Sequence, residues 1–378
     1  MTLTASTVPP SLVFLTTHSS AGGAQEIWMN LAESYIKRGF RAKLCALYPG
    51  REEVRETASG LEWHYLAPRR PSSPMEALRL LASMVRFLRT ERPDYVLSAM
   101  PAANIISPLA GRLAGGKTGF AISHHTPVQT YSPVLNAVDG ITGQLRNVRA
   151  IVSVSEAVSR SLDGKSRGYK AKRQTIYNAL PQRIEEHLAG LASQRLDERP
   201  VRRRLVATGR LAEQKNYPVL LRAAALLPDV EIRIVGSGPA EAELKALAAR
   251  LGVADRVEFL GQRSREEALA ILASGDVFVQ PSLFEGHSLG LIEAAKLGLP
   301  LLVSNVPVQL EGITGPDGAL CGLAVDPQNE VALAEAARTL LEDDAQYEHW
   351  TGRARALAAS ATFENMLAAY DTVILPQR

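Results

Sequence analysis

The sequence lacks several features that would define other protein classes. It has only two cysteines, Cys45 and Cys321, far apart and each within an apolar run. This excludes a disulfide framework or a cysteine metal site and predicts buried thiols in a reducing compartment. No stretch approaches the roughly 18 apolar residues of a membrane span. The apolar run Leu12–Leu15 lacks a basic region before it and is too short for a signal peptide.

What is present suits a soluble globular enzyme of two domains. The chain has 378 residues, 46% hydrophobic and 21% charged, with a net charge of +3. Residues 1–190 hold 23 Lys and Arg against 14 Asp and Glu, whereas the remainder holds 19 against 25. The basic first half is expected to meet an anionic surface or substrate. Charge drift without a function is an equal alternative.

The first half alternates short apolar runs with helical patterns, which predicts a doubly wound, largely parallel α/β sheet. The helical pattern Ala24–Arg38 follows the first strand and is stopped by Gly39. The expected strands are Ser11–Thr16, Ala42–Leu47, Tyr95–Ala99, Gly119–Ser123, Ala150–Val154 and Gln174–Tyr177.

The alternation restarts after a polar, charge-rich stretch over residues 184–204, which is the expected domain boundary. We therefore expect a first domain over 1–190 and a second over 200–358, with a cleft between them. The expected strands of the second domain are Leu205–Thr208, Glu231–Val235, Val257–Leu260, Val277–Val279 and Pro300–Val303. Ligands in such sheets bind at the carboxyl ends of the strands, so the cleft is the expected site.

The segment 281–293 places Glu285 in a loop after a strand and Glu293 about two turns into a helix that begins at Ser288 or Leu289. Backbone N–H groups at that helix N-terminus form a ready site for phosphate. Two carboxylates beside it suit a diphosphate ligand with sugar and ribose hydroxyls. By itself, the segment is explained more simply by two solvated glutamates at a strand–loop–helix join.

Cations and glycines follow other strands. Arg210 and Lys215 lie on the loop after the first strand of the second domain, where two cations could neutralise a diphosphate leaving group. Gly22 and Gly23 follow the first strand of the chain and would let backbone approach a ligand closely. A plain tight turn explains the glycine pair equally well.

Two adjacent histidines, His124 and His125, end a strand of the first domain. Adjacent strand residues face opposite sides of the sheet, so at most one of them is expected to reach the cleft, and the pair is a poor metal chelate. The sequence does not decide which histidine it is.

Gly111–Thr118 matches the phosphate-loop pattern G-x-x-x-x-G-K-[ST]. That chemistry requires a strand before the glycines and a helix after them. Here a helical run precedes and a strand follows, so the glycines are interpreted as a helix stop.

Together, the residues resemble the retaining family 4 glycosyltransferases of the GT-B fold, in which two Rossmann-like domains face each other across a cleft. The resemblance covers nearly the whole chain and is strongest from Val206 to about Asp326. It is carried by the Glu-x7-Glu segment and supported by 209–216, 234–239 and 256–261. It implies an acceptor-side first domain, a donor-binding second domain and a C-terminal helix, about 360–378, that packs back on the first.

The resemblance also implies roles. Arg210 and Lys215 would hold the donor diphosphate, Glu293 the ribose, and Glu285 the donor sugar near the reacting carbon. The backbone of Ser288, Leu289 and Gly290 would cap the diphosphate. The loop of Gly261, Gln262 and Arg263 would flank the base. Gly22 and Gly23 would approach the donor from the first domain, where His125 best matches the family's active-site histidine and His124 is the alternative.

Three positions depart from the family pattern: His287 where an aromatic or aliphatic residue is usual, Asn178-Ala179 where Asn-Gly is common, and Ser237 where an acidic residue is frequent. None removes an assigned catalytic group. His287 is expected to alter the sugar pocket.

We expect transfer of a sugar from a UDP- or GDP-sugar to a hydroxyl of a glycan or lipid-linked acceptor, with retention by front-face displacement. The setting implied is bacterial polysaccharide or glycolipid assembly. No cofactor, metal or nucleic acid is expected, and no Asp-x-Asp segment is present to hold a metal. A sugar-nucleotide epimerase or hydrolase, or a non-catalytic nucleotide-sugar-binding protein, are the alternatives.

The expected location is cytoplasmic, with peripheral docking of the basic first domain on the anionic inner face of the plasma membrane. The candidate element is the Arg-rich helix Ala77–Arg89, in which Leu78, Leu81, Val85 and Leu88 share a face. Packing of that face on the sheet is the alternative.

Overall fold

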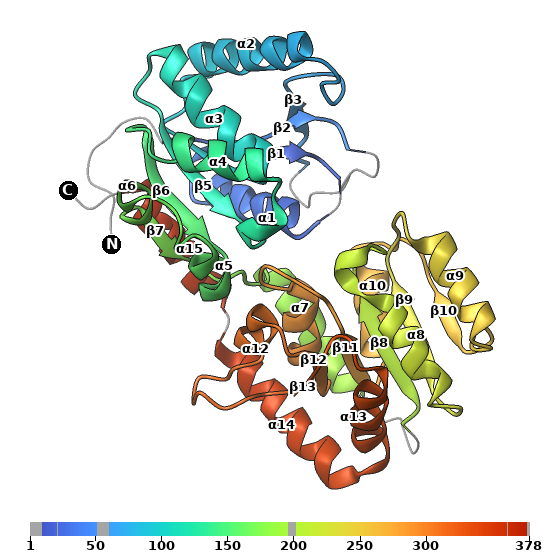
Figure 1. Ribbon diagram of the computed structural model, residues 1–378. Coiled ribbons are helices and arrows are strands. Elements are labelled where there is room, and N and C mark those ends of the chain that lie inside the picture. Colours follow the sequence, from blue (N-terminus) through green and yellow to red (C-terminus); the bar gives the residue numbers. More distant parts are fainter. Residues whose placement is uncertain (1–9, 21, 51–59, 196–201, 361, 376–378) are drawn as a thin grey trace. The chain divides into compact units, whose positions relative to one another are not determined.

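A computed structural model describes residues 10–20, 22–50, 60–195, 202–360 and 362–375. The chain divides into two compact units (Figure 1). Unit 1 contains Met1–Tyr177 and Glu364–Arg378, and unit 2 contains Asn178–Phe363. Each unit is built on its own parallel sheet, as the alternation of strand and helix patterns predicts.

The described residues of unit 1 form a seven-stranded sheet in the order β3-β2-β1-β4-β5-β6-β7, with every neighbouring pair parallel. The strands are β1 (Ser11–His18), β2 (Arg41–Tyr48), β3 (Trp63–Tyr65), β4 (Tyr95–Ala99), β5 (Gly119–His124), β6 (Val148–Ser153) and β7 (Arg173–Thr175). The helices are α1 (Gly23–Lys37), α2 (Pro74–Glu91), α3 (Pro101–Ala114), η1 (Val128–Thr130), α4 (Pro133–Thr142), α5 (Glu156–Ser161), α6 (Arg167–Lys170) and, from the chain end, α15 (Phe363–Ile374).

Apolar side chains on both faces of this sheet explain its helical layers. Leu80 and Met84 of α2 lie in one buried cluster with Val13 and Leu15 of β1. The last helix, α15, packs on α1: the rings of Tyr370 and Trp28 meet edge to face at 5.8 Å. Asp371 accepts hydrogen bonds from Tyr35 at 3.0 Å and from Arg38 at 2.9 and 2.8 Å.

The described residues of unit 2 form a six-stranded parallel sheet in the order β10-β9-β8-β11-β12-β13. The strands are β8 (Arg204–Thr208), β9 (Glu231–Val235), β10 (Val257–Phe259), β11 (Val277–Gln280), β12 (Leu301–Ser304) and β13 (Leu323–Val325). The helices are α7 (Gln182–Arg195), η2 (Glu213–Lys215), α8 (Tyr217–Ala225), α9 (Glu241–Arg250), α10 (Arg265–Ala273), α11 (Leu289–Lys296), α12 (Pro307–Gly312), α13 (Glu330–Glu342) and α14 (Asp344–Ser360).

The division between the units differs from the sequence expectation. The chain passes from unit 1 to unit 2 at Tyr177, not near residue 190. The reason is α7, which is polar in sequence but buries Ile184 and Leu188 and pairs Glu185 with Lys296 of α11 at 2.7 Å. Residues 196–201 of the expected linker lie outside the described residues.

Two smaller expectations are confirmed. The segment Gly111–Thr118, which matches the phosphate-loop pattern, ends a helix. The helix α3 stops at Ala114, and Gly115 adopts a left-handed conformation with φ 75° before β5 begins. Cys45 and Cys321 are buried free thiols. Among the described residues, no helix combines the length and apolar character needed to cross a membrane.

Candidate functional site

The strand orders place the predicted site loops at the switch point of each sheet. In unit 2 the chain winds outward in opposite directions from β8 and β11, which are neighbours. The loop after β8 carries Arg210 and Lys215, and the loop after β11 carries Glu285 and His287. The carboxyl ends of two such strands flank a crevice in doubly wound sheets. Topology alone therefore brings these two loops together.

Lys215 and Glu285 form the contact between the loops. Lys215 Nζ lies 2.7 Å from Glu285 Oε1, and their side chains are 15% and 9% exposed. Glu285 Oε2 accepts a 3.3 Å hydrogen bond from Gln214 Nε2, so both carboxylate oxygens are engaged. The cation and the amide together compensate the burial of this carboxylate.

Backbone contacts fix the loop that carries Lys215. Asn216 adopts a left-handed conformation with φ 51°, and its side-chain Nδ2 donates to the backbone carbonyls of Pro281 and Pro327 at 3.1 and 2.7 Å. Gly209 has φ 139°, and a Cβ there would lie 2.6 Å from Lys215 Cε. The positive φ favours glycine at this position, and a Cβ would also displace the end of the Lys215 side chain. Arg210, which follows, is exposed.

The helix N-terminus expected at Ser288 or Leu289 is confirmed. Ser288 is the N-cap of α11 and accepts from the amide of Leu291 at 3.4 Å. The Ser288 hydroxyl donates to Gln280 Oε1 at 2.8 Å, and Gln280 in turn donates to Gln309 at 3.2 Å. Gln280 and Gln309 are buried, so an amide pair behind the loop sets where α11 begins.

Glu293 lies in the second turn of α11 and is 4% exposed. It is ion-paired with Arg265, the first residue of α10. The loop of Gly261, Gln262 and Arg263 directly precedes α10, so the structure connects the predicted base loop to Glu293 through Arg265. Gly261 itself has φ 68°, and its carbonyl accepts from the amide of Gly236 at 3.0 Å.

His287, which departs from the family pattern, is contacted by Asn178, the residue before the departing Ala179. Asn178 Nδ2 donates to the carbonyl of His287 at 2.9 Å. Burial lowers the pKa of His287 to about 4. The imidazole is therefore neutral at physiological pH and adds no cation to the loop.

In unit 1, the corresponding switch point lies between β1 and β4. Gly22 is the N-cap of α1 with extended backbone, and Gly23 is the first helical residue. Gln25 of the same turn donates to the carbonyl of His18 at 3.0 Å. The glycine pair thus lies after β1, as expected.

The two histidines differ sharply in environment. His124 is fully buried and its ring nitrogens lie 3.1 and 2.8 Å from the hydroxyls of Tyr131 and Tyr169. His125 is partly exposed, with Nε2 3.1 Å from Ser123 Oγ and its ring edge-on to Trp28 at 5.7 Å. Burial, with a smaller contribution from His124, lowers the pKa of His125 to about 3. His125 is thus the histidine with an exposed part.

The sequence did not single out Gln214, Arg265, Gln280 or Gln309. Each acts through a side-chain contact with a residue far along the chain, and sequence spacing carries no signal for such contacts.

Comparisons with known proteins match both units. Residues 21–182 match the family model described as Glycosyltransferase Family 4, and residues 192–357 match Glycosyl transferases group 1. The D-inositol 3-phosphate glycosyltransferase of Mycolicibacterium smegmatis is 36% identical over 43% of this chain and 40% of its own length. The alignment thus spans well under two thirds of that relative. The lipopolysaccharide core biosynthesis glycosyltransferase LpsD of Rhizobium meliloti is 26% identical over 86% of this chain and 87% of its own.

Solved structures share the fold at lower identity. Anabaena HepE in complex with UDP and glucose has a TM-score of 0.78 and 19% identity, covering 96% of this chain and 98% of its own. The glycosyltransferase WaaG, involved in lipopolysaccharide biosynthesis, has a TM-score of 0.75 and 16% identity, covering 97% of this chain and 100% of its own. The two units are thus similar to the two domains of group 1/family 4 glycosyltransferases, and the fold of the chain is GT-B.

Proposed function

We propose that the protein transfers a sugar from a UDP- or GDP-sugar to a hydroxyl acceptor, with retention at the anomeric carbon and without a metal. The observation that carries this proposal is the Lys215–Glu285 pair, held at the switch point of unit 2 beside the N-terminus of α11. A cation, a fixed carboxylate and helix N–H groups at one sheet edge suit a diphosphate with a sugar attached.

The donor would be held by charge and by helix geometry. An ammonium carries three donors, so Lys215 retains Glu285 and still reaches a phosphate oxygen. Arg210 and the backbone of Ser288, Leu289 and Gly290 would complete the diphosphate site. Glu293 would bind the ribose, with Arg265 paired to its carboxylate, and the loop 261–263 would flank the base. UDP in the solved structure of HepE, a neighbour in fold, supports a nucleotide donor.

In the proposed reaction, the bond from the anomeric carbon to the diphosphate oxygen breaks as the acceptor oxygen attacks the same face. The departing phosphate takes the acceptor's proton. Lys215 and Arg210 would stabilise the charge that develops on the leaving group, and losing one such donor would cost about 3 kcal/mol. Glu285 and neutral His125 would contact the donor sugar, and Gly22 and Gly23 would approach it from unit 1.

A thermal-shift panel of UDP-, GDP- and ADP-sugars tests the donor site. We expect one nucleotide sugar to raise the Tm of the wild type, and Lys215→Ala and Glu293→Ala to abolish the shift. Lys245→Ala, an exposed lysine on α9, serves as the control. The donor assignment is wrong if no nucleotide sugar stabilises the wild type, or if the site variants respond as it does. Product analysis with donor alone then separates a transferase from an epimerase or hydrolase, and absence of turnover with any acceptor indicates a binding protein.

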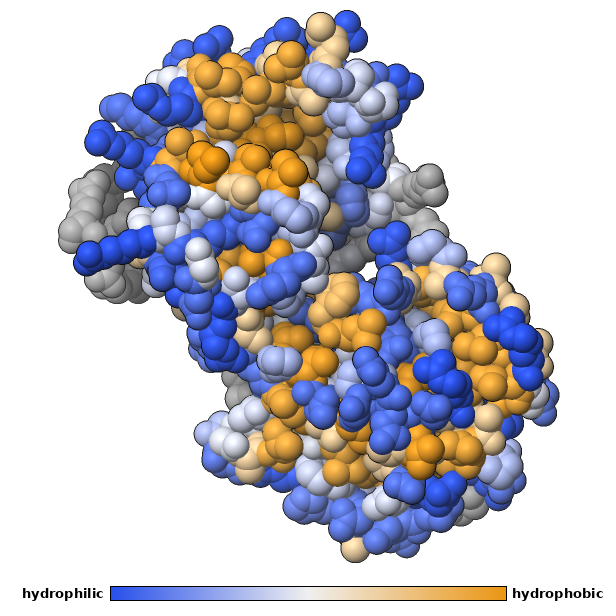
Figure 2. All heavy atoms as spheres, viewed as in Figure 1, coloured by the Kyte–Doolittle hydropathy of each residue, from blue (hydrophilic) through white to orange (hydrophobic). Residues whose placement is uncertain are grey.

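We also propose that the acceptor is a glycan or is lipid-linked and that unit 1 docks on the anionic inner face of the plasma membrane. Apolar side chains gather over α2, α3 and α4 (Figure 2). Leu78, Leu113, Val134 and Ile141 are 61%, 52%, 71% and 67% exposed. Leu88 lies in the core, so the face expected for α2 is only partly outward: Leu78, Leu81 and Val85 line a groove of about 600 Å³ against Leu113.

Arginines border the groove. Arg86 and Arg89 line it, and Arg79 and Arg112 are exposed on the same helices. Apolar side chains that enter the headgroup region, flanked by cations, suit an anionic bilayer. Co-sedimentation with phosphatidylglycerol vesicles should fall severalfold in Leu113→Ser and be unchanged in the matched Val331→Ser on α13, which is also 52% exposed. Binding that does not depend on anionic lipid would remove the docking proposal.

A further inference from the structure

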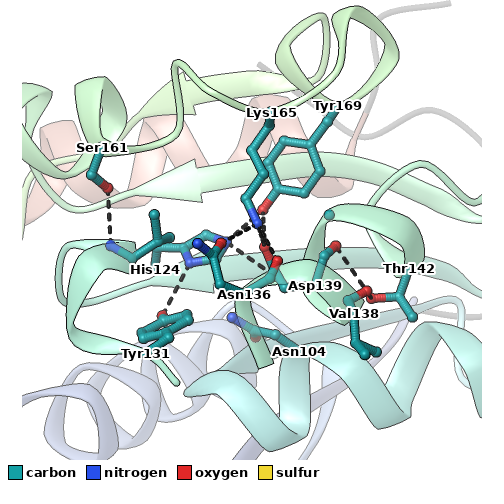
Figure 3. Close-up of polar contacts among 12 residues, drawn as sticks. Asn104, His124, Tyr131, Asn136, Val138, Asp139, Thr142, Ser161, Lys165 and Tyr169 are labelled. Atoms are coloured by element: carbon teal, nitrogen blue, oxygen red, sulfur yellow. Dashed lines mark hydrogen bonds and ion pairs between the residues drawn. The ribbon is translucent and has the colours of Figure 1, made fainter. Parts of the chain in front are cut away.

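A buried polar cluster surrounds His124 at the end of β5. It consists of His124, Tyr131, Asp139, Lys165 and Tyr169, which we call the His124 cluster (Figure 3). His124 ends β5, Tyr131 follows η1, Asp139 lies on α4, Lys165 lies in the turn before α6, and Tyr169 lies on α6. The proposed reaction uses none of these residues except His124, which is only the alternative to His125.

The contacts form a continuous chain. Lys165 Nζ lies 3.0 Å from Asp139 Oδ2, which also accepts a 2.9 Å hydrogen bond from the Tyr169 hydroxyl. The Tyr169 hydroxyl lies 2.8 Å from His124 Nε2, and the Tyr131 hydroxyl lies 3.1 Å from His124 Nδ1. Asp139 and His124 are 0% exposed.

The protonation states of Tyr169 and His124 determine which group donates in each hydrogen bond of the cluster. Burial and the Asp139 carboxylate raise the pKa of Tyr169, and burial lowers the pKa of His124. Tyr169 therefore keeps a single proton, and because it donates that proton to Asp139 it must accept from His124 Nε2–H. His124 Nδ1 then carries the lone pair and accepts from Tyr131. Only one tautomer of His124 satisfies both tyrosines.

The cluster closes a loop. His124 and Tyr131 are its two ends, and the six residues between them include His125. The middle of the loop is tied as well, because the amide of Val128 donates to Ser161 Oγ at 3.1 Å. Asn136 on α4 accepts from Lys165 through both its backbone carbonyl and its side-chain oxygen. The Asp139–Lys165 pair thus joins α4 to the turn before α6, on the side of His124 opposite Tyr131.

A buried ion pair is weak evidence for added stability, since apolar replacements of similar volume often stabilise a protein equally well. What such a pair does impose is a single geometry, because every misplaced partner leaves a buried charge unsatisfied. We propose that Asp139, through Tyr169 and His124, and Tyr131 directly are positioning residues that fix the loop 125–130 and hence the His125 ring. The consequence for catalysis rests on the proposed contact of His125 with the donor sugar.

The test uses the full chain with two variants and a control. Tyr131→Phe removes one hydroxyl and keeps the ring, and Asp139→Asn removes the charge that holds Lys165. Tyr95→Phe on β4 removes a hydroxyl outside the cluster. Imidazole ¹⁵N spectra of the wild type should show His124 as the Nε2–H tautomer, and a His124 Nδ1–H tautomer would overturn the assignment.

Loop order is measured by diethylpyrocarbonate modification of His125, followed by peptide mass spectrometry. We expect the rate to rise about fivefold in Tyr131→Phe, the change expected when one ordinary hydrogen bond closes the loop. It should be unchanged in Tyr95→Phe. If Asp139→Asn fails to fold, Tyr131→Phe alone decides, and equal rates in Tyr131→Phe and wild type would overturn the proposal.

Kinetics add a distinction from a purely structural role. With a competent donor and acceptor, Tyr131→Phe should lower kcat about fivefold while UDP binding stays at the wild-type value. A loss of UDP binding in Tyr131→Phe would indicate general damage and contradict the positioning role. If no donor is turned over by any form, the proposed function fails, whereas the tautomer and the modification rates still decide the inference.

Discussion

Lys215 and Glu285 are 70 positions apart in the sequence and 2.7 Å apart in space, each largely buried. Lys215→Met should therefore do two separable things. It leaves the Glu285 carboxylate without its cation, which is expected to cost about 3 kcal/mol of folding free energy, and it removes a donor from the leaving group.

The double variant Lys215→Met/Glu285→Gln separates the two effects. The amide that replaces the Glu285 carboxylate carries no charge, so much of the stability should return while transfer stays low. Denaturant unfolding and steady-state rates measure the two quantities. Recovery of both together would show that Lys215 acts only on stability.

Substitutions of Glu285 and Glu293 are expected to affect different quantities, kcat and UDP affinity respectively. Glu293→Gln removes the charge that Arg265 pairs with and should weaken UDP affinity by about tenfold, as for a lost charge-assisted hydrogen bond. Glu285→Gln should leave UDP affinity nearly unchanged and lower kcat. Calorimetric UDP titration and kinetics check this, with exposed Glu266→Gln on α10 as the control. An unchanged UDP affinity in Glu293→Gln would refute its ribose role.

Gly290 packs against β8 so closely that a Cβ there would lie 2.6 Å from Thr208 Oγ1. Gly290→Ala should therefore displace the start of α11 and destabilise the protein by about 1–3 kcal/mol. Thr208→Ala removes the clashing oxygen, so the double variant should regain most of the lost Tm. If the double variant has the same Tm as Gly290→Ala, the contact with Thr208 is not the cause of the destabilisation.

Acid should destabilise the protein through His287. Its pKa is lowered by burial from 6.5 to about 4, so between these values the unfolded chain binds a proton that the folded chain does not. The free energy of unfolding is unaffected by His287 above pH 6.5 and decreases as the pH falls below that value. The loss amounts to at most about 2 kcal/mol at pH 5. His287→Asn should lose less Tm than wild type between pH 7.5 and 5. Parallel Tm curves for the two proteins would contradict this.

Sequence patterns predicted most of the sheet strands, because a short apolar run between two helical patterns is typical of a buried parallel strand. They missed β3 and β13, which are three residues long and carry little periodicity. They also placed the domain boundary too late, since the polar composition of α7 hides the two residues by which it packs.

For the site, motif spacing located the loops but not their internal contacts. The Gln280–Gln309 pair joins the end of β11 to α12, and such a contact leaves no local pattern in the sequence. Strand alternation left His124 and His125 undecided. In the structure, Tyr131 and Tyr169 contact His124 and bury it, whereas His125 stays partly exposed. The positions of the two tyrosines follow only from the packing of η1 and α6 around the end of β5.

Because α15 belongs to unit 1, the whole of unit 2 is inserted into the chain of its neighbour. Met366, Tyr370, Val373 and Ile374 complete a core that Trp28 and Tyr35 begin. During synthesis, all of unit 2 therefore leaves the ribosome before the rest of α15, the helix that completes the core of unit 1. Maturation of the protein would then run from the inserted unit to the discontinuous one, against the order in which the two begin.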